Sequence, residues 1–455
     1  MESSVVLKDT VLLFDRYTAD SRRLHESFLR AGGGCSAVVL EENHFLPAGV
    51  LSVYDMFLGY FEEEGERLGK PKFFNEIPAP DHWSIQAGVG ETDYGRITYQ
   101  HEEKGRIHYW KSEKKWLVES VDWFDRKGAV RFRDHYNRYG MICARTFYNG
   151  QEKELGKTWF SAGGQEAITE NAVPGDLIVN DGALIKFFRK KMDMICYFFQ
   201  RAGIEQKKIF YNSLANPFVV SGKLSAPAKR DILFWQEDVK DAVPGNMQAI
   251  LSGQASRTNR IMVQKRSAYD RLMELGVTPD QVQRLGYVYD FKKENGHRPQ
   301  ALICTNSERI EHGEELIQSF PQMHFHIAAV TLMSPKLMDM ERYENVSLYP
   351  CVQADTLDQL FLQCDYYFDI NHWTEIVSAV YRAFLHNQLI FAFEETAHNR
   401  EYTADAHVYP KEAFAKMAAD VKEIMKSREK MEFHLKLQLK DAMAEEKETY
   451  AGLLD

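Results

Sequence analysis

The stretch "DINHWTEIVSAVYRAFLHNQLIFAF", residues 369–393, reads as the end of a strand, a loop, a helix, a short turn and a second strand. Its last run, "LIFAF", is apolar throughout, which is typical of a strand that is buried on both faces of a parallel sheet. Similar strand-loop-helix units precede it, at "ALICTNS", "HFHIAAV" and "NVSLYP". We therefore predict a Rossmann-like α/β domain over residues 271–430.

The N-terminal residues open another domain of this class. The run "TVLLFD" is an apolar strand, "TADSRRLHESFLRAG" is an amphipathic helix that ends at Gly32, and "CSAVVLE" is a second buried strand. Helical and buried-strand patterns resume at "DLIVND" and continue to "RSAYDRLMELG". These patterns predict one Rossmann-like domain made of residues 1–50 and 176–270.

A different pattern interrupts this domain. Short segments that alternate apolar and polar residues, among them "RITYQ", "RIHYW" and "AVRFRDHYNRYG", follow one another about every ten residues and are separated by turn sequences. Such spacing is typical of an antiparallel meander, so we predict an inserted antiparallel β-sheet add-on domain at residues 51–175. Residues 431–455 are rich in helix formers and are expected to form a C-terminal helix that returns to the first domain.

Composition excludes several classes of protein. The 455 residues are 44% hydrophobic and 27% charged and carry a formal charge of −10, whereas a general nucleic-acid binder is normally basic. The six cysteines form no C-x-x-C pair, and the histidines show no metal-binding spacing, so we expect buried free thiols, no metal and no cofactor. We find no signal peptide and no run approaching the ~18 apolar residues of a membrane helix. These features predict a cytoplasmic protein, or one bound peripherally to the inner face of the cell membrane.

Two facing α/β domains bind ligands at the carboxyl ends of their strands, across the cleft. In retaining nucleotide-sugar transferases of this form, an Arg and a Lys of the second domain stabilise the diphosphate leaving group. The corresponding loop here, "ICTNSERIEHGEELI", has Asn306 or Ser307 at the arginine position and Glu311 or His312 at the lysine position. An acid at this place would repel a diphosphate.

Such transferases also use two glutamates in the pattern E-x7-E to bind the donor sugar and ribose. The opening stretch has Thr374 and Arg382 at these two positions, and Glu375 is displaced by one residue. We therefore predict a pocket that keeps its scaffold and has lost its chemistry, with no catalytic residue. Its members are Asn306, Ser307, His312, Asn371, His372, Thr374, Glu375 and Arg382.

Two further groups are candidates for binding a polypeptide. Residues expected at the cleft ends of the first domain's strands are candidates for acceptor binding; they are Asn212, Trp235, Gln236 and Glu237. The alternative is that Trp235 packs in the core and Asn212 caps a helix. Aromatic residues of the meander are candidates for contact with a partner or a peptide; they are Trp123, Phe124, Tyr136 and Tyr139. The alternative is that these side chains pack the inner face of the meander.

Long segments of this chain resemble the GtfB family, the non-catalytic glycosylation subunits of the accessory Sec system in Gram-positive bacteria. They include "LFDRYTADSRRLHESFLRAG", "FYNSLANPFVVS" and "DINHWTEIVSAVYRAFLHNQLIFAFEETAHN", in one order along the chain. The resemblance implies a glycosyltransferase-B-like fold with an added β-sheet domain. It also implies a complex with the catalytic subunit GtfA, commonly two copies of each, which transfers GlcNAc from UDP-GlcNAc to Ser/Thr of a serine-rich repeat adhesin before export.

Three functions follow from these patterns. The first is a subunit that stabilises the catalytic chain and binds the acceptor polypeptide. The second is an active retaining glycosyltransferase that uses a UDP-sugar through an atypical donor site, with Glu375, Glu311 or Glu237 replacing the standard groups. The third is an unrelated structural or regulatory sugar-binding module. Binding and turnover of UDP-GlcNAc by the chain alone separate the first function from the second.

Overall fold

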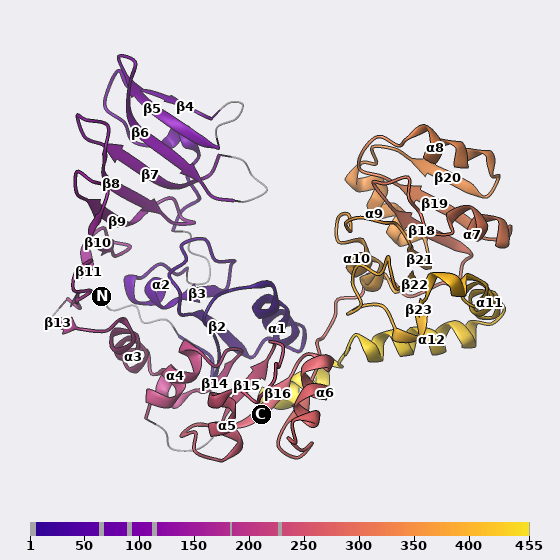
Figure 1. The fold of residues 1–455 in the computed structure, drawn as a ribbon. Coiled ribbons are helices and arrows are strands. Elements are labelled where there is room, and N and C mark those ends of the chain that lie inside the picture. The colour runs from indigo at the N-terminus through magenta and orange to yellow at the C-terminus, as the bar shows by residue number, and fades with distance from the viewer. Residues whose placement is uncertain are drawn as a thin grey trace.

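Three β-sheets organise the chain (Figure 1), in a computed structural model that describes residues 6–62, 68–88, 93–111, 116–182, 184–225 and 230–454. Two sheets are parallel and carry helices, and the third is antiparallel. The antiparallel strands lie in sequence between the third and fourth strands of the first parallel sheet, in the order that an insertion produces. The predicted fold class is therefore confirmed.

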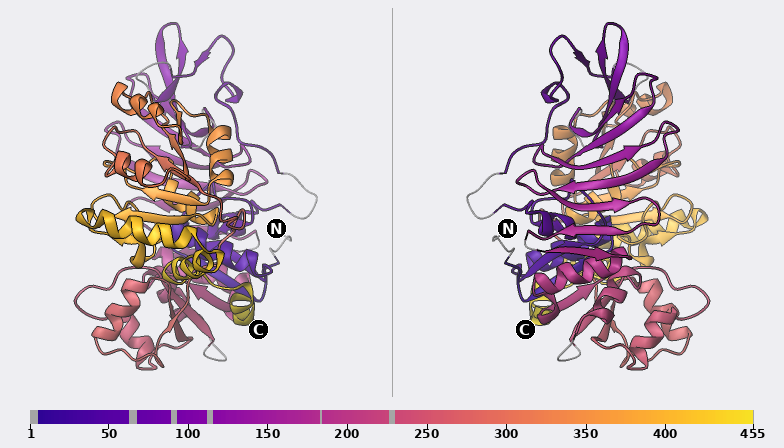
Figure 2. Two further views of the ribbon diagram at one scale, coloured as in Figure 1. Left: turned by 90° about the vertical axis from the view of Figure 1, so that its right-hand side faces the viewer. Right: turned by 90° about the vertical axis from the view of Figure 1, so that its left-hand side faces the viewer.

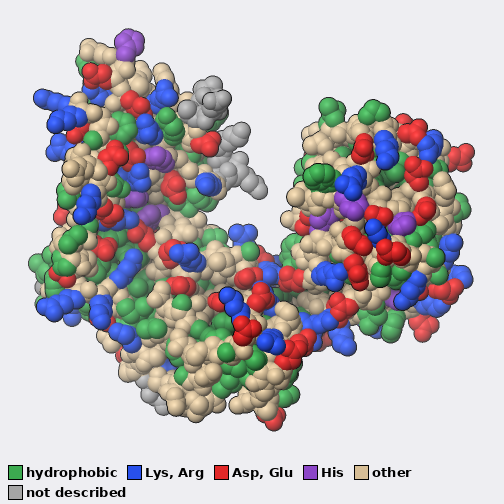
Figure 3. All heavy atoms as spheres, in the orientation of Figure 1, with side chains coloured by type: hydrophobic (Ala, Val, Ile, Leu, Met, Phe, Trp, Pro, Cys, Tyr) green, Lys and Arg blue, Asp and Glu red, His purple; other side chains and the backbone are tan. Residues whose placement is uncertain are grey.

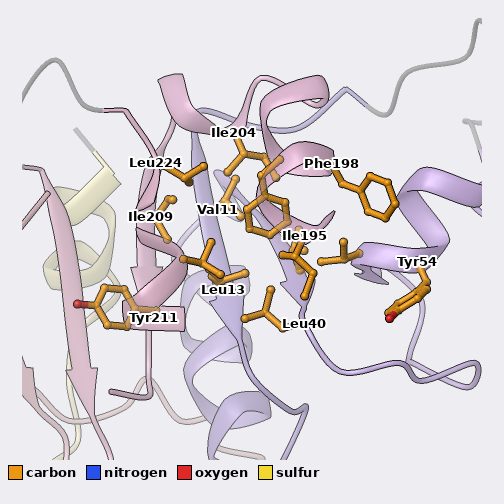
Figure 4. Packing of buried hydrophobic residues seen from close by; sticks show 14 of the residues in the cluster. Val11, Leu13, Leu40, Tyr54, Ile195, Phe198, Ile204, Ile209, Tyr211 and Leu224 are labelled. Carbon is orange, nitrogen blue, oxygen red and sulfur yellow. The ribbon is translucent and has the colours of Figure 1, made fainter. Parts of the chain in front are cut away.

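The first parallel sheet has the order β17-β16-β15-β14-β1-β2-β3. Its strands are β1 (Thr10–Phe14), β2 (Cys35–Val39), β3 (Val50–Ser52), β14 (Lys208–Tyr211), β15 (Asp231–Trp235), β16 (Thr258–Val263) and β17 (Gln283–Arg284). Its helices are α1 (Ala19–Arg30), α2 (Val53–Leu58), α3 (Lys191–Arg201), α4 (Asn216–Lys223), α5 (Gly245–Leu251) and α6 (Arg266–Glu274). Side chains of β1 and β14, among them Val11, Leu13 and Ile209, pack against α3 through Ile195 and Phe198 (Figure 4). All five residues of β1 are buried, which explains why its sequence is apolar from Val11 to Phe14.

The antiparallel sheet is a ten-stranded meander in sequence order. Its strands are β4 (Ser84–Gln86), β5 (Tyr94–Tyr99), β6 (Glu102–Tyr109), β7 (Val118–Phe124), β8 (Val130–Tyr136), β9 (Ile142–Tyr148), β10 (Glu154–Phe160), β11 (Glu166–Asn171), β12 (Leu177–Asn180) and β13 (Ile185–Phe188). At the β10–β13 end, one face of the sheet is buried against the first domain, where Trp159 stacks on Tyr54 of α2 at 5.5 Å. The opposite end extends away from that domain (Figure 1).

Two local predictions were wrong. The segment "DLIVND" was expected to rejoin the parallel sheet, but β12 pairs with β11 and β13 inside the antiparallel sheet. The start of the second domain was expected near "VQRLGYVYDF", but Gln283–Arg284 pairs with β16 of the first sheet. A short apolar strand such as β12 looks alike in both kinds of sheet, and the two exposed polar residues of β17 carry no strand pattern, so local pattern cannot assign either one. The domain boundaries stay a prediction.

The second parallel sheet has the order β20-β19-β18-β21-β22-β23. Its strands are β18 (Gln300–Cys304), β19 (His324–Ala328), β20 (Val346–Tyr349), β21 (Tyr366–Asp369), β22 (Leu389–Phe393) and β23 (Val408–Tyr409). Its helices are α7 (Gly313–Ser319), α8 (Pro335–Met338), α9 (Ala354–Gln363), α10 (Ala379–Leu385), α11 (Phe414–Met425) and α12 (Arg428–Asp441). The opening stretch thus forms the end of β21, a loop, α10 and β22, as predicted.

The C-terminus returns to the first domain. After α12 the chain forms α13 (Lys447–Leu454), which packs on α1, and the ring of Tyr450 lies 4.9 Å from that of Phe28. Between the two parallel domains, Arg23 Nη1 donates to Tyr402 Oη at 2.8 Å. The second parallel domain and the antiparallel sheet stand on opposite sides of a hollow whose floor is the first domain (Figures 1 and 3), and they lie one behind the other in the side views of Figure 2. In the described part of the chain, no helix is long and apolar enough to span a bilayer.

Candidate donor and acceptor sites

A pocket of about 450 Å³ lies at the carboxyl ends of β18, β19 and β21. The loops after these three strands line it, because neighbouring parallel strands end at the same edge of the sheet. Four of the eight predicted pocket residues lie here together: Asn306, Ser307, His372 and Thr374. Glu308, Arg309, Leu332, Met333, Ser334 and Trp373 complete most of the wall.

The loop after β18 is held by its own polar groups. The buried Thr305 hydroxyl donates to the Ser307 carbonyl at 2.8 Å and accepts from the Ser307 N–H at 2.9 Å. Ser307 Oγ in turn accepts from the Arg309 N–H at 3.0 Å. The assignment of Asn306 or Ser307 to the arginine position overlooked Arg309, which is exposed at the pocket. The only signal for it was a basic residue two positions after Ser307.

His312 and Asn371 lie outside this pocket wall. His312 contacts Glu315, shares a hydrogen bond of 2.8 Å with the Lys411 carbonyl, and stacks on Phe414 at 4.9 Å. Asn371 is buried where its backbone bridges to Ile310. Both residues therefore support the scaffold.

Arg382 and Glu375 are also directed away from the pocket. The Arg382 guanidinium lies 4.2 Å from the centroid of the Phe361 ring and pairs with Asp358, and both partners belong to α9. Glu375 Oε1 accepts from the Val380 N–H at 2.8 Å in the first turn of α10. The expectation that Arg382 projects toward the cleft is wrong, because spacing along a helix does not set which neighbouring helix a long side chain reaches.

A strained loop presents Trp373 at the pocket. Trp373, Val377 and Ser378 all adopt left-handed backbone angles, with φ values of 85°, 47° and 51°. Such angles are costly for a β-branched residue such as Val377 and are common at functional loops. His398 holds the loop: its Nδ1 lies 2.6 Å from Asp369 Oδ1, and its Nε2 lies 2.9 Å from the Trp373 carbonyl oxygen. The hydrogen bond to Asp369 raises the pKa of His398.

The predicted acceptor residues cluster at the ends of β14 and β15. Trp235 and Gln236 are buried, Asn212 is half-buried, and Glu237 is exposed. Asn212 Nδ2 donates to Gln236 Oε1 at 2.6 Å, and Gln236 Nε2 donates to the Asp20 carbonyl at 2.9 Å. Trp235 is therefore core, as the alternative held, whereas Asn212 belongs to a polar network and does not cap a helix.

A second pocket at the same edge of the first sheet was not anticipated. It has a volume of about 340 Å³ and lies at the ends of β1 and β2, where Arg16 and Glu41 pair at 3.1 Å. Asn216, the first residue of α4, donates to Asp15 Oδ1 at 2.9 Å. Because these loops carry no recognisable motif, only their convergence in space reveals the pocket.

The predicted aromatic contacts of the meander divide into two pairs. Tyr136 and Tyr139 are buried, so their side chains are not on the surface of this chain. Trp123 is half-buried, and its Nε1 donates to Asp134 at 2.9 Å. Phe124 is half-buried and lines a groove of about 720 Å³ across β6, β7 and β8.

This groove on the antiparallel sheet carries charges of both signs. Asp122 lies in it between His108, 2.7 Å away, and the Nε of Arg133, 2.6 Å away. Burial opposes ionisation of this carboxyl, but hydrogen bonds from His108 and Arg133 prevail and lower the pKa of Asp122 to about 2. The groove therefore keeps both a negative and a positive charge at neutral pH. Among the described residues, no group of three or more His, Cys, Asp or Glu could hold a metal ion.

Comparison with known structures defines the class first. A chain in the crystal structure of the GtfA/B complex bound to UDP and GlcNAc is 39% identical, with a TM-score of 0.77, and the match covers 97% of this chain and 98% of that one. The crystal structure of TarM matches with a TM-score of 0.53 over 98% and 99% of the two chains, and at 12% identity it supports the fold alone. The chain therefore has a glycosyltransferase-B-like fold.

Sequence comparison then gives the family. Models of the GtfB N-terminal, middle and third domains match residues 11–57, 83–189 and 191–275, and the GftB/GlyA-F C-terminal domain matches residues 301–438. The UDP-N-acetylglucosamine–peptide N-acetylglucosaminyltransferase stabilizing protein GtfB of Streptococcus gordonii is 41% identical over 94% of both chains. That of Streptococcus agalactiae is 38% identical over 88% of this chain and 89% of its own. This chain belongs to the GtfB family.

Proposed function

We propose that this chain is a non-catalytic subunit of a protein O-GlcNAc transferase. It stabilises a GtfA-type catalytic chain, with two copies of each in the complex, and binds a serine-rich repeat adhesin that is glycosylated on Ser/Thr before export by the accessory Sec system. The names of its relatives and the solved GtfA/B complex support this assignment. The complex works in the cytoplasm, at the inner face of the cell membrane.

The arrangement of the pocket at the ends of β18, β19 and β21 carries the non-catalytic part of the proposal. Thr374 and Ser307 stand at positions where a donor site needs a carboxylate and a cation, and neither supplies one. The side chain of Glu375 accepts a hydrogen bond from the first turn of α10, and that of Arg382 pairs with Asp358 of α9. Without these charges, the leaving diphosphate lacks the stabilisation that drives transfer.

Acceptor binding is assigned to the hollow between the domains. Glu237 at the end of β15 is exposed, and Asn212 beside it presents a half-buried amide. On the antiparallel sheet, the groove with Phe124, Asp122 and Arg133 offers an apolar ring beside fixed charges. A serine-rich polypeptide is apolar-poor, so such polar groups with a few rings suit its recognition.

Co-expression tests the stabilising role. With this chain present, we expect a GtfA-type partner to be more soluble and to glycosylate a serine-rich peptide, whereas this chain with UDP-GlcNAc and the peptide should show no transfer. A partner that is equally soluble and active alone would refute stabilisation. Turnover by the isolated chain would refute the non-catalytic assignment.

Peptide binding is tested separately by Glu237→Ala and Phe124→Ala in the assembled complex. We expect each to weaken peptide affinity several-fold without loss of the partner. Glu448→Ala, which removes an exposed acid on α13, is the matched control for Glu237→Ala. If all three variants bind the peptide as the parent complex does, the acceptor binds elsewhere.

One observation favours the alternative of an active glycosyltransferase with an atypical donor site. Arg309 is a cation at the pocket that could face a diphosphate, two residues from the expected position. Arg309→Ala decides between the two functions: a catalytic pocket would lose turnover in the assembled complex, whereas we expect the rate to stay within about twofold.

A further inference from the structure

The edge of the antiparallel sheet exposes an unusual group of apolar side chains. Ile185 and Phe187 of β13 are 77% and 56% exposed, and Leu184 just before them is 61% exposed. Phe187 pairs with Ile178 of β12, whose side chain is also exposed on that face. Leu177 and Val179 point to the opposite face and are buried in the core, so the outer face is not part of the core.

A basic segment contains and follows this apolar edge, and in it the side chains of Lys186 and Lys191 lie over the rings of Tyr197 and Tyr54. Residues 184–191, "LIKFFRKK", contain Lys186, Arg189, Lys190 and Lys191 and no acid. Arg189 and Lys190 are exposed at the junction of β13 and α3. The nearest acid before the segment, Asp181, is paired with Arg201 of α3. In Figure 3 hydrophobic side chains lie beside a group of Lys and Arg side chains at the edge where Figure 1 labels β13 and α3.

This combination differs from the rest of the chain. The formal charge of the protein is −10, so its average surface is repelled by an anionic bilayer. A local basic group beside protruding apolar side chains reverses that repulsion and adds insertion of apolar area.

We propose that β13 and the start of α3 form a membrane-docking surface for anionic lipid. Leu184, Ile185 and Phe187 enter the boundary between headgroups and acyl chains, and Arg189 and Lys190 bind the phosphate groups of the lipids. This inference rests on the proposed location at the inner face of the membrane and assigns that location to particular residues.

Sedimentation with vesicles tests the surface, using the full chain and its complex with the partner. We expect binding to vesicles of phosphatidylcholine with about 30% phosphatidylglycerol, weak binding to pure phosphatidylcholine, and loss of binding as salt is raised. Phe187→Glu should weaken binding by about tenfold or more, and Arg189→Ala with Lys190→Ala should remove the preference for the anionic lipid.

Phe433→Glu is the matched control. Phe433 on α12 is 58% exposed, close to the 56% of Phe187, and its replacement changes charge and apolar area equally elsewhere on the protein. Exposed positions of this kind tolerate substitution, and urea unfolding checks that both variants remain folded.

Three outcomes would overturn the proposal. The first is that neither the chain nor the complex sediments with anionic vesicles. The second is that Phe187→Glu and Phe433→Glu bind equally. The third is that Phe187→Glu loses the partner during co-purification, which would make this edge a protein interface. Glycosylation of a soluble peptide by the Phe187→Glu complex is expected to match the parent, so loss of vesicle binding alone leaves the proposed function standing.

Discussion

The guanidinium of Arg382 lies over the ring of Phe361, 4.2 Å from its centroid, so an arginine on α10 is committed to α9. Asp358, one turn before Phe361 on α9, pairs with the same guanidinium. A donor site has its second glutamate at this position of α10. Here the side chain at this position does not reach the pocket at the ends of β18, β19 and β21. The pocket lacks this chemistry because of side-chain direction as well as residue type.

Arg382→Ala should lower the free energy of unfolding by about 1 kcal/mol, since it removes a cation–π contact and a partly exposed ion pair. Glycosylation by the assembled complex should stay within about twofold of the parent. Arg382→Glu should also fail to confer transfer on the isolated chain, because the side chain is directed toward α9. A peptide glycosylation assay checks both variants, and a large loss of turnover in a folded complex would mean that this position takes part in the reaction.

Asp365 should make the stability of the second domain dependent on pH. Its buried carboxylate accepts from the Arg298 Nε at 2.9 Å and contacts Lys293. Burial opposes ionisation, but these bonds prevail and lower the pKa of Asp365 to about 2. Since the folded pKa lies below the unfolded value, the stabilisation is complete above about pH 4 and is lost as the pH falls toward 2.

Asp365→Asn is therefore expected to cost about 3 kcal/mol at pH 7, because Lys293 stays buried without its partner charge. Urea unfolding at pH 7 and pH 3 should show this cost shrinking at the lower pH. Asp280→Asn, at an exposed acid, is the control and should change stability by less than about 0.5 kcal/mol. An equal cost for Asp365→Asn at both pH values would contradict the assignment.

His398 should have the opposite pH dependence. Its pKa is raised by the hydrogen bond to Asp369, so its contribution to stability is complete below the unfolded value near 6.5 and declines as the pH rises through the folded pKa. Only the doubly protonated ring can donate to Asp369 and to the Trp373 carbonyl together.

His398→Gln should lower the free energy of unfolding by about 1–2 kcal/mol at pH 5.5 and by less at pH 9. Denaturant unfolding of both proteins at the two pH values measures the difference. A cost that grows with pH would show that the neutral ring is the stabilising form.

The contact between Tyr450 and Phe28 should make α13 essential to the first domain. Tyr450 is fully buried, and its hydroxyl donates to the Gly286 carbonyl at 2.6 Å. Tyr450→Ala should destabilise the protein by about 3–5 kcal/mol through the cavity, whereas Tyr450→Phe should cost about 1–2 kcal/mol for the lost hydrogen bonds. Thermal or urea unfolding checks the ranking, and similar costs for both variants would mean that packing is not the main contribution.

The periodicity of apolar residues in the sequence was sufficient to predict which segments form parallel sheets and which form the antiparallel sheet. The apolar runs of β1 and β22 are buried on both faces, and the alternating segments from β5 to β11 form the meander, because burial on one or two faces directly determines which residues a strand tolerates. The lack of charge at positions 307 and 374 could also be predicted, because serine and threonine carry no charged group wherever they lie in the fold.

Only the tertiary structure decided which sheet β12 and β13 join, where Arg382 points, and that Trp373, Arg309 and the loop after β19 meet at one pocket. Each of these depends on partners far away in the chain. The apolar side chain of Leu177 is suited to a strand of either sheet. Which helix Arg382 contacts depends on which neighbouring helix places an acid and an aromatic ring beside it. The sequence by itself determined which residues must be buried and which chemistry is missing; the packing of distant segments determined what each remaining side chain contacts.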